Sequence, residues 1–167
     1  VGTATGTVQI GTMSYTNITG NAGDGIDVNI QDDSNANLGN LSGNVITNSG
    51  MGIRVNAFDT SAFFLQMGTT GATVGDNLLA SNVDAGIGIQ LFDTAVANVN
   101  VAYTDITGTT DLAGTADFLG DGLRVITNDS SRLDTFFVGG TNPAAPDVNI
   151  TGNAGRGVSI ETRISSV

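Results

Sequence analysis

Four aspartates recur at one position of an internal repeat, where they could bind a metal ion. Each lies seven residues after a repeated glycine and is followed by a short polar residue; they are Asp32, Asp59, Asp93 and Asp129. If the repeats stack, the carboxylates form a column with like charges about 5 Å apart, and calcium ions between them would relieve the repulsion. The alternative, which we favour, is that each aspartate closes a turn and accepts hydrogen bonds from backbone N–H groups. Calcium is the only cofactor that the sequence suggests.

Four asparagines share a second repeated position. They stand four residues before the same glycine and are Asn21, Asn48, Asn82 and Asn153. Stacked inside a corner, their amides could bond to one another and to the backbone of the turn. Because asparagine also tolerates turn conformations, we interpret this column as a structural ladder.

Residues suited to catalysis are scarce. The chain has no Lys, His or Cys, so one of five arginines would have to serve as a base. Paired carboxylates can also perform acid–base chemistry, and the best candidates for an outer groove lie in or beside an insertion in the repeat: Asp111, Asp117 and Asp121. We assign no catalytic residue, and an enzyme is the less favoured interpretation.

The arginines are expected on the surface. Asp27 and Arg54 both stand two residues after the repeated glycine, which predicts an outward ion pair between neighbouring repeats. Arg124 has Gly88 and Ser159 at the equivalent positions and therefore no such partner. We expect Arg124 to be solvated.

The repeat that organises these positions is an Asn, three mostly small or polar residues, a Gly, and then two apolar residues separated by one other. Its glycines are Gly25, Gly52, Gly86, Gly122 and Gly157, at intervals of 27, 34, 36 and 35 residues. Apolar residues stand one and three positions after each glycine, eleven and thirteen after most, and seven before, where they are Ile18, Val45, Leu79 and Ile150. Three short alternating strands per repeat predict one rung of a parallel β-helix.

Two other repeat architectures fit less well. A propeller blade needs four antiparallel strands with hairpin signals, and a leucine-rich repeat needs its own Leu and Asn spacing. The chain has neither pattern. The sequence therefore predicts an all-β solenoid of about five coils with three short strands per coil.

One domain is expected over residues 1–167. Residues 1–16 form an incomplete first coil, 109–119 an inserted loop, and 139–146 a corner that holds both prolines and lies outside the ladder. Neither end of the sequence resembles the polar cap of a repeat protein. We therefore expect a segment of a longer chain or a subunit that stacks end to end.

Composition limits the partners. A net charge of −11 makes nucleic acid or an anionic membrane surface an unfavourable partner. No run of eighteen apolar residues is present, so membrane insertion is not expected.

The aromatic residues are assigned to the core. Phe58 and Phe92 share a repeat position, and with Phe63 and Phe64 they predict an aromatic stack inside the helix. With no Trp and only two Tyr, the sequence suggests no aromatic platform for sugars.

The repeat blocks between Asn17 and Thr162 resemble the right-handed parallel β-helix repeats of the pectate-lyase-like superfamily, especially the Asn/Gly-rich repeats of large bacterial surface and secreted proteins. The resemblance implies a right-handed coil. It leaves function open, because that superfamily includes lyases, hydrolases, adhesins and purely structural segments.

The sequence thus favours a non-enzymatic structural or adhesive β-helix of an extracellular surface protein or filament. Its expected partners are other copies, joined end to end or along strand edges, and a surface glycan. The alternative is a polysaccharide lyase or hydrolase of the same superfamily, whose lyases use Arg or Lys as a base beside calcium-binding Asp. Ice binding would need a regular threonine array, which the unequal repeat lengths disfavour.

Overall fold

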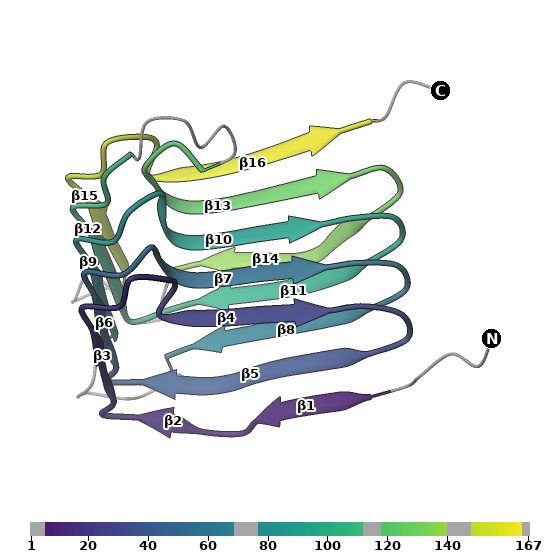
Figure 1. Ribbon diagram of the computed structural model, residues 1–167, viewed down its shortest axis with the longest axis horizontal. Helices are drawn as coiled ribbons and strands as arrows, with labels where there is room; N and C mark the ends of the chain where they lie inside the picture. Colours follow the sequence, from purple (N-terminus) through teal and green to yellow (C-terminus); the bar gives the residue numbers. More distant parts are fainter. Residues whose placement is uncertain (1–5, 69–76, 112–117, 140–147, 165–167) are drawn as a thin grey trace.

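A computed structural model describes residues 6–68, 77–111, 118–139 and 148–164 of the 167-residue chain. In these segments every regular element is a β-strand, and every strand pairing is parallel. The chain winds upward through three sheets as a right-handed coil (Figure 1), the hand that parallel crossovers adopt. The predicted parallel β-helix, with about five coils of three strands, is confirmed.

Each sheet takes one strand from each coil, and we name the sheets A, B and C. Sheet A contains β1 (Thr7–Ile10), β2 (Met13–Ser14), β5 (Asn35–Ser42), β8 (Ala62–Met67), β11 (Val96–Val101) and β14 (Arg132–Val138). Sheet B contains β3 (Asn17–Thr19), β6 (Val45–Thr47), β9 (Asn77–Ala80), β12 (Thr104–Thr107) and β15 (Val148–Thr151). Sheet C contains β4 (Ile26–Ile30), β7 (Met51–Ala57), β10 (Ala85–Leu91), β13 (Asp121–Asn128) and β16 (Val158–Arg163).

The core is a set of columns that run along the axis of the coil. In sheet C, Ile53 pairs with Ile87 and Ile87 with Leu123, and all three side chains are fully buried. Alternation along each strand sends every second residue inward, where it stacks on the same position of the next coil. Each such aliphatic side chain contributes about 1.5–3 kcal/mol through burial.

One core position differs from the sequence prediction. In the second coil, which comprises β6, β7 and β8, Ile46 and not Val45 aligns with Ile18 and Leu79, and Ile46 is fully buried. The second coil has six residues from this apolar position to its glycine, where the third coil has seven. Counting back from Gly52 therefore selects the outward neighbour.

The repeated glycines are required because neighbouring coils approach closely at them. A Cβ on Gly52 would lie 2.5 Å from the carbonyl oxygen of Gly86, and one on Gly86 would lie 2.7 Å from that of Gly122. Gly25 and Gly122 face the glycine of the following coil in the same way. Such distances are shorter than van der Waals contact, so any side chain here would push two coils apart.

Candidate functional site

The four repeated aspartates occupy identical turns between sheets C and A. Each has φ near +58°, a left-handed conformation that Asp tolerates better than most residues. The residue before each aspartate accepts a hydrogen bond from the residue two after it, as between Phe58 O and Ser61 N (3.1 Å). The turns therefore stack as a column, as the repeat predicts.

Two carboxylates of this column bind the backbone of the preceding coil. The Asp32 N–H donates to Asp59 Oδ2 (3.1 Å), and the Asp59 N–H donates to Asp93 Oδ2 (3.3 Å). The carboxylates thus act on turn N–H groups, as the favoured interpretation holds, but across coils rather than within one turn. Among the described residues no three acidic side chains converge as a ligand set for a metal ion. Calcium binding at Asp32, Asp59, Asp93 and Asp129 stays a prediction.

An aromatic pair lies beside these turns. The rings of Phe58 and Phe92 are stacked, with centroids 4.7 Å apart and planes 7° from parallel. Both are only half-buried, whereas Phe63 is in the core and Phe64 is exposed on the outer face of sheet A. The prediction of four phenylalanines inside the helix is therefore wrong for three of them, because the corner and the strand alternation turn these rings outward.

The asparagine ladder lies at the corner between sheets B and C. Asn82 is fully buried; its Nδ2 donates to Ile46 O (3.1 Å), and its Oδ1 accepts from Ser49 N (3.2 Å). Asn153 bonds to Ile106 O and Thr109 N in the same manner. Each amide thus satisfies backbone groups of the preceding coil.

Asn48 is not part of this ladder. It is exposed, has φ of +53°, and stands at the position of Ser81 in the next coil. Ser49 takes the ladder position, where its Oγ accepts from Asn21 Nδ2 (3.3 Å). The cause is again the shorter corner of the second coil, which has two residues between the ladder position and the glycine instead of three.

A second amide ladder lies at the start of sheet B. Asn77 Oδ1 accepts from Asn44 N and Asn44 Nδ2 (both 3.1 Å), and Asn77 Nδ2 donates to Leu41 O (2.9 Å). Both asparagines are buried. Their sequence signal is an Asn two residues before the buried apolar residue of the strand, Ile46 or Leu79, and it is visible only once the second coil is correctly aligned.

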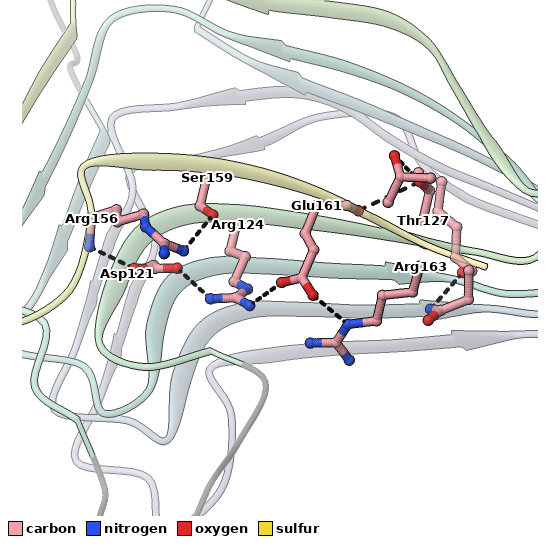
Figure 2. Close-up of polar contacts among 10 residues, drawn as sticks. Asp121, Arg124, Thr127, Arg156, Ser159, Glu161 and Arg163 are labelled. Carbon is pink, nitrogen blue, oxygen red and sulfur yellow. Dashed lines mark hydrogen bonds and ion pairs between the residues drawn. The ribbon is translucent and has the colours of Figure 1, made fainter. Parts of the chain in front are cut away.

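Arg124 is at the centre of a charged cluster on the outer face of sheet C (Figure 2). Its Nη1 contacts Asp121 Oδ2 at 2.9 Å and its Nη2 contacts Glu161 Oε2 at 2.5 Å. Arg163 Nε contacts Glu161 Oε1 at 2.6 Å, and Asp121 Oδ1 accepts from the Arg156 N–H. These contacts join β13 to the next coil.

The expectation of a solvated Arg124 is wrong, since only 2% of the residue is exposed. Phe118, at the end of the predicted insertion, packs with Met51 and Ala85 over the neighbouring Gly88. The acidic partners are Asp121 and Glu161, which do not stand at the repeat position of Arg124, two residues after the glycine. Likewise, Arg54 contacts Asp24 at 3.5 Å, and the predicted pair with Asp27 is not formed although the two backbones are paired.

The arginines of the cluster change the pKa of the Glu161 carboxyl. The hydrogen bond from Arg163 lowers the pKa of the Glu161 carboxyl below its ordinary value, and the charges of Arg163 and Arg124 add to this against the effect of burial. Glu161 is therefore ionised at neutral pH, as its two arginine contacts require.

The three hydrolase candidates are only partly described, and those that are described form no carboxylate pair. Asp121 is buried and paired, Asp111 is exposed on the corner, and Asp117 lies outside the described residues. The predicted loop 109–119 is described only at its two ends, and of the predicted corner 139–146 only Gly139 is described. Across the described segments we find no helix with the length and apolarity needed to span a bilayer.

A comparison of the chain with protein-family models, curated proteins and solved structures finds no match in any of the three.

Proposed function

We propose that this chain is a non-enzymatic structural or adhesive β-helix segment of an extracellular surface protein or filament, in which further β-helix coils stack on its ends. The main support is the exposure of inward-facing residues at both ends of the described stack. Val8 is 59% exposed in β1, and Ile160 is 52% exposed in β16, although each occupies a core column. Apolar core positions at an unpaired strand edge favour addition of another strand.

The charges of the end coils favour a head-to-tail arrangement. The first complete coil, residues 17–42, carries four aspartates and no arginine. The described residues of the last coil, 148–164, carry two arginines and one glutamate. An acidic end and a basic end attract each other, whereas two like ends repel.

The glycine column supports the same arrangement. A Cβ on Gly157 would meet only ordinary contacts of 3.6 and 3.8 Å, unlike the crowded glycines of the preceding coils. A coil stacked on β16 would bring a carbonyl against Gly157, as Gly157 itself does against Gly122. The last glycine therefore suits a position inside a longer stack.

Membership of the pectate-lyase-like superfamily, near its Asn/Gly-rich surface repeats, is part of the proposal and rests on the repeat blocks. The alternative of a polysaccharide lyase or hydrolase has less support, because Asp121 is buried beside Arg124 and held by the Arg156 N–H. Incubation with a panel of polysaccharides, followed by an assay for new reducing ends or unsaturated products, would detect that activity.

Sedimentation velocity and electron microscopy over a range of protein concentrations test the stacking. We expect concentration-dependent assembly that weakens as salt is added. Ile160→Asp should prevent assembly without unfolding the protein, because the residue is already half exposed. The control is Phe64→Asp, which places the same charge at an exposed position on the outer face of β8, in the middle of sheet A and away from both ends of the stack. Monomers at all concentrations, or equal effects of the two variants, would contradict end-to-end stacking.

A further inference from the structure

A groove crosses the outer face of sheet A over β1, β5, β8 and β11. It is open to solvent and has a volume of about 370 Å³, and its polar and aromatic walls are Thr7, Gln9, Asn35, Asn37, Phe64 and Asn98. We call it the Phe64 groove. Its volume is within the range of small-molecule sites.

Phe64 forms the aromatic wall. Its neighbours Phe63 and Leu65 point into the core, so strand alternation turns the Phe64 ring outward, where 37% of the residue is exposed. An exposed ring among the polar side chains of this groove offers a flat apolar surface to a ligand.

The amides that surround Phe64 are unengaged. Within the described structure the side chains of Gln9, Asn35, Asn37 and Asn98 make no hydrogen bond, and the Oδ1 of Asn37 is a buried acceptor without a partner. In contrast, the amides of Asn77 and Asn82 each bond to backbone groups through both the oxygen and the nitrogen. A carboxamide presents both donors and an acceptor, so these side chains can bind a hydroxyl group whether it donates or accepts the hydrogen bond.

The groove is also uncharged. The strands β1, β5, β8 and β11 contain no charged residue, although the chain carries a net charge of −11. An anionic ligand would gain no cation here and would be repelled by the rest of the molecule. A cationic ligand would find no carboxylate on these strands. The chemistry therefore selects a ligand rich in hydroxyls and without charge.

We propose that the Phe64 groove binds a neutral oligosaccharide. The apolar C–H face of one sugar ring packs on Phe64, and its hydroxyls exchange hydrogen bonds with Asn35, Asn98 and Gln9. The amide of Asn37 lies deeper in the floor of the groove. This inference rests on the adhesive form of the proposed function and gives that function its ligand class.

Isothermal titration calorimetry with neutral β-1,4-linked tetrasaccharides of glucose, xylose, mannose and N-acetylglucosamine tests the site. We expect at least one to bind, Phe64→Ala to weaken that binding by about tenfold, and Asn98→Ala to weaken it further in the double variant. Tetragalacturonate, which is anionic, should not bind. Phe137→Ala is the matched control, because Phe137 is an exposed ring on the same sheet (44%) outside the groove.

Circular dichroism melting of each variant separates loss of binding from loss of fold. No heat from any of the four neutral sugars, or equal loss in Phe64→Ala and Phe137→Ala, would overturn the proposal. The outcome is separate from that of the stacking experiment, since assembly and sugar binding use different faces. Chromatography of the sugars after titration shows whether they are intact, and cleavage would refute the non-enzymatic function while retaining the site.

Discussion

Arg124 and Asp121 stand three residues apart in β13 and form a buried ion pair, with 2.9 Å between Nη1 and Oδ2. The same guanidinium reaches Glu161 in β16, so one side chain connects its own strand to the last described coil. The pair is on the outer face of the sheet, where surface charges usually contribute little to stability. Because the pair is buried, neither side chain can replace the other with water, and removing one should cost more stability than at an exposed pair.

Replacing Arg124 with Met should destabilise the protein by about 3–5 kcal/mol, because it removes the ion-pair partner of the buried Asp121 side chain and leaves that side chain only the Arg156 N–H. Urea denaturation measures this free energy of unfolding. Arg54→Met is the control, since Arg54 has 40% of its side chain exposed and a single acidic contact at 3.5 Å. It should cost less than about 1 kcal/mol. Similar losses in the two variants would show that Arg124 contributes only its aliphatic stem.

Stability should depend on pH through Glu161. Its folded-state pKa lies below the ordinary value of 4.5, chiefly because of the hydrogen bond from Arg163. The ionised form therefore stabilises the fold above the ordinary pKa, and this contribution is lost as the pH falls through the folded-state pKa. Melting temperatures of the wild type and Glu161→Gln should differ at neutral pH and converge in acid. A constant difference throughout the acid range would refute the assignment, and NMR titration of the Glu161 carboxyl gives the pKa directly.

The glycine column gives a test with an internal control. Gly86→Ala should cost about 1–3 kcal/mol, because the new Cβ meets the carbonyl of Gly122 at 2.7 Å and the side chain of Ile106. Gly157→Ala should change the free energy of unfolding by less than about 1 kcal/mol, since its nearest contact is 3.6 Å away. Chemical denaturation of both variants checks this difference. Equal costs would mean that backbone entropy, rather than contact between coils, explains the glycines.

The corner ladder predicts that substitutions at two asparagines, which share one position in the sequence repeat, reduce the free energy of unfolding by different amounts. Asn82→Ala should lose about 1–3 kcal/mol, because Ser49 N and Ile46 O are left buried without partners. Asn48→Gly should be nearly neutral, since Asn48 is exposed and its left-handed conformation suits glycine. Amide hydrogen exchange at Ser49 should quicken in the first variant alone. Protection at Ser49 that survives in Asn82→Ala would contradict the ladder.

The aspartate column can be tested for calcium directly. If the carboxylates act on backbone N–H groups, a chelator should leave the melting temperature unchanged, and Asp59→Asn should cost about 1 kcal/mol or less with or without calcium. The amide keeps an oxygen that can accept from Asp32 N. A calcium-dependent rise in melting temperature that disappears in Asp59→Asn would establish the metal site instead.

Periodicity was sufficient to predict the coil, because the inward residues recur at fixed distances from a repeated glycine. That glycine recurs because neighbouring coils pack too closely there for any side chain. It failed at Val45 and Asn48, where one missing residue between Ser49 and Gly52 shifts everything before the glycine. A gap of this kind is visible only when the hydrogen-bonding register of β6 is known.

The Arg124 cluster and the Phe64 groove were missed for other reasons. Arg124 was compared with residues at its own repeat position, whereas its partners stand three residues earlier and in the next coil. Phe64 was grouped with Phe63 as a core residue, although adjacent residues of a strand face opposite sides. Both errors concern side chains on the outside of the coil, where the repeat places little constraint on the residue type.

The direction of the hydrogen bonds between coils has a mechanical consequence. Because all three sheets are parallel and stack coil upon coil, these bonds run along the axis of the stack, and the described ends lie at opposite ends of it (Figure 1). Tension between the chain ends would therefore pull along these bonds at a terminal strand and break them one after another, so that a coil peels away strand by strand. A coil that detaches would then release its whole contour, roughly 120 Å for a repeat of about 35 residues. Under tension such a stack would lengthen coil by coil, and each coil would dissipate work as it peels away.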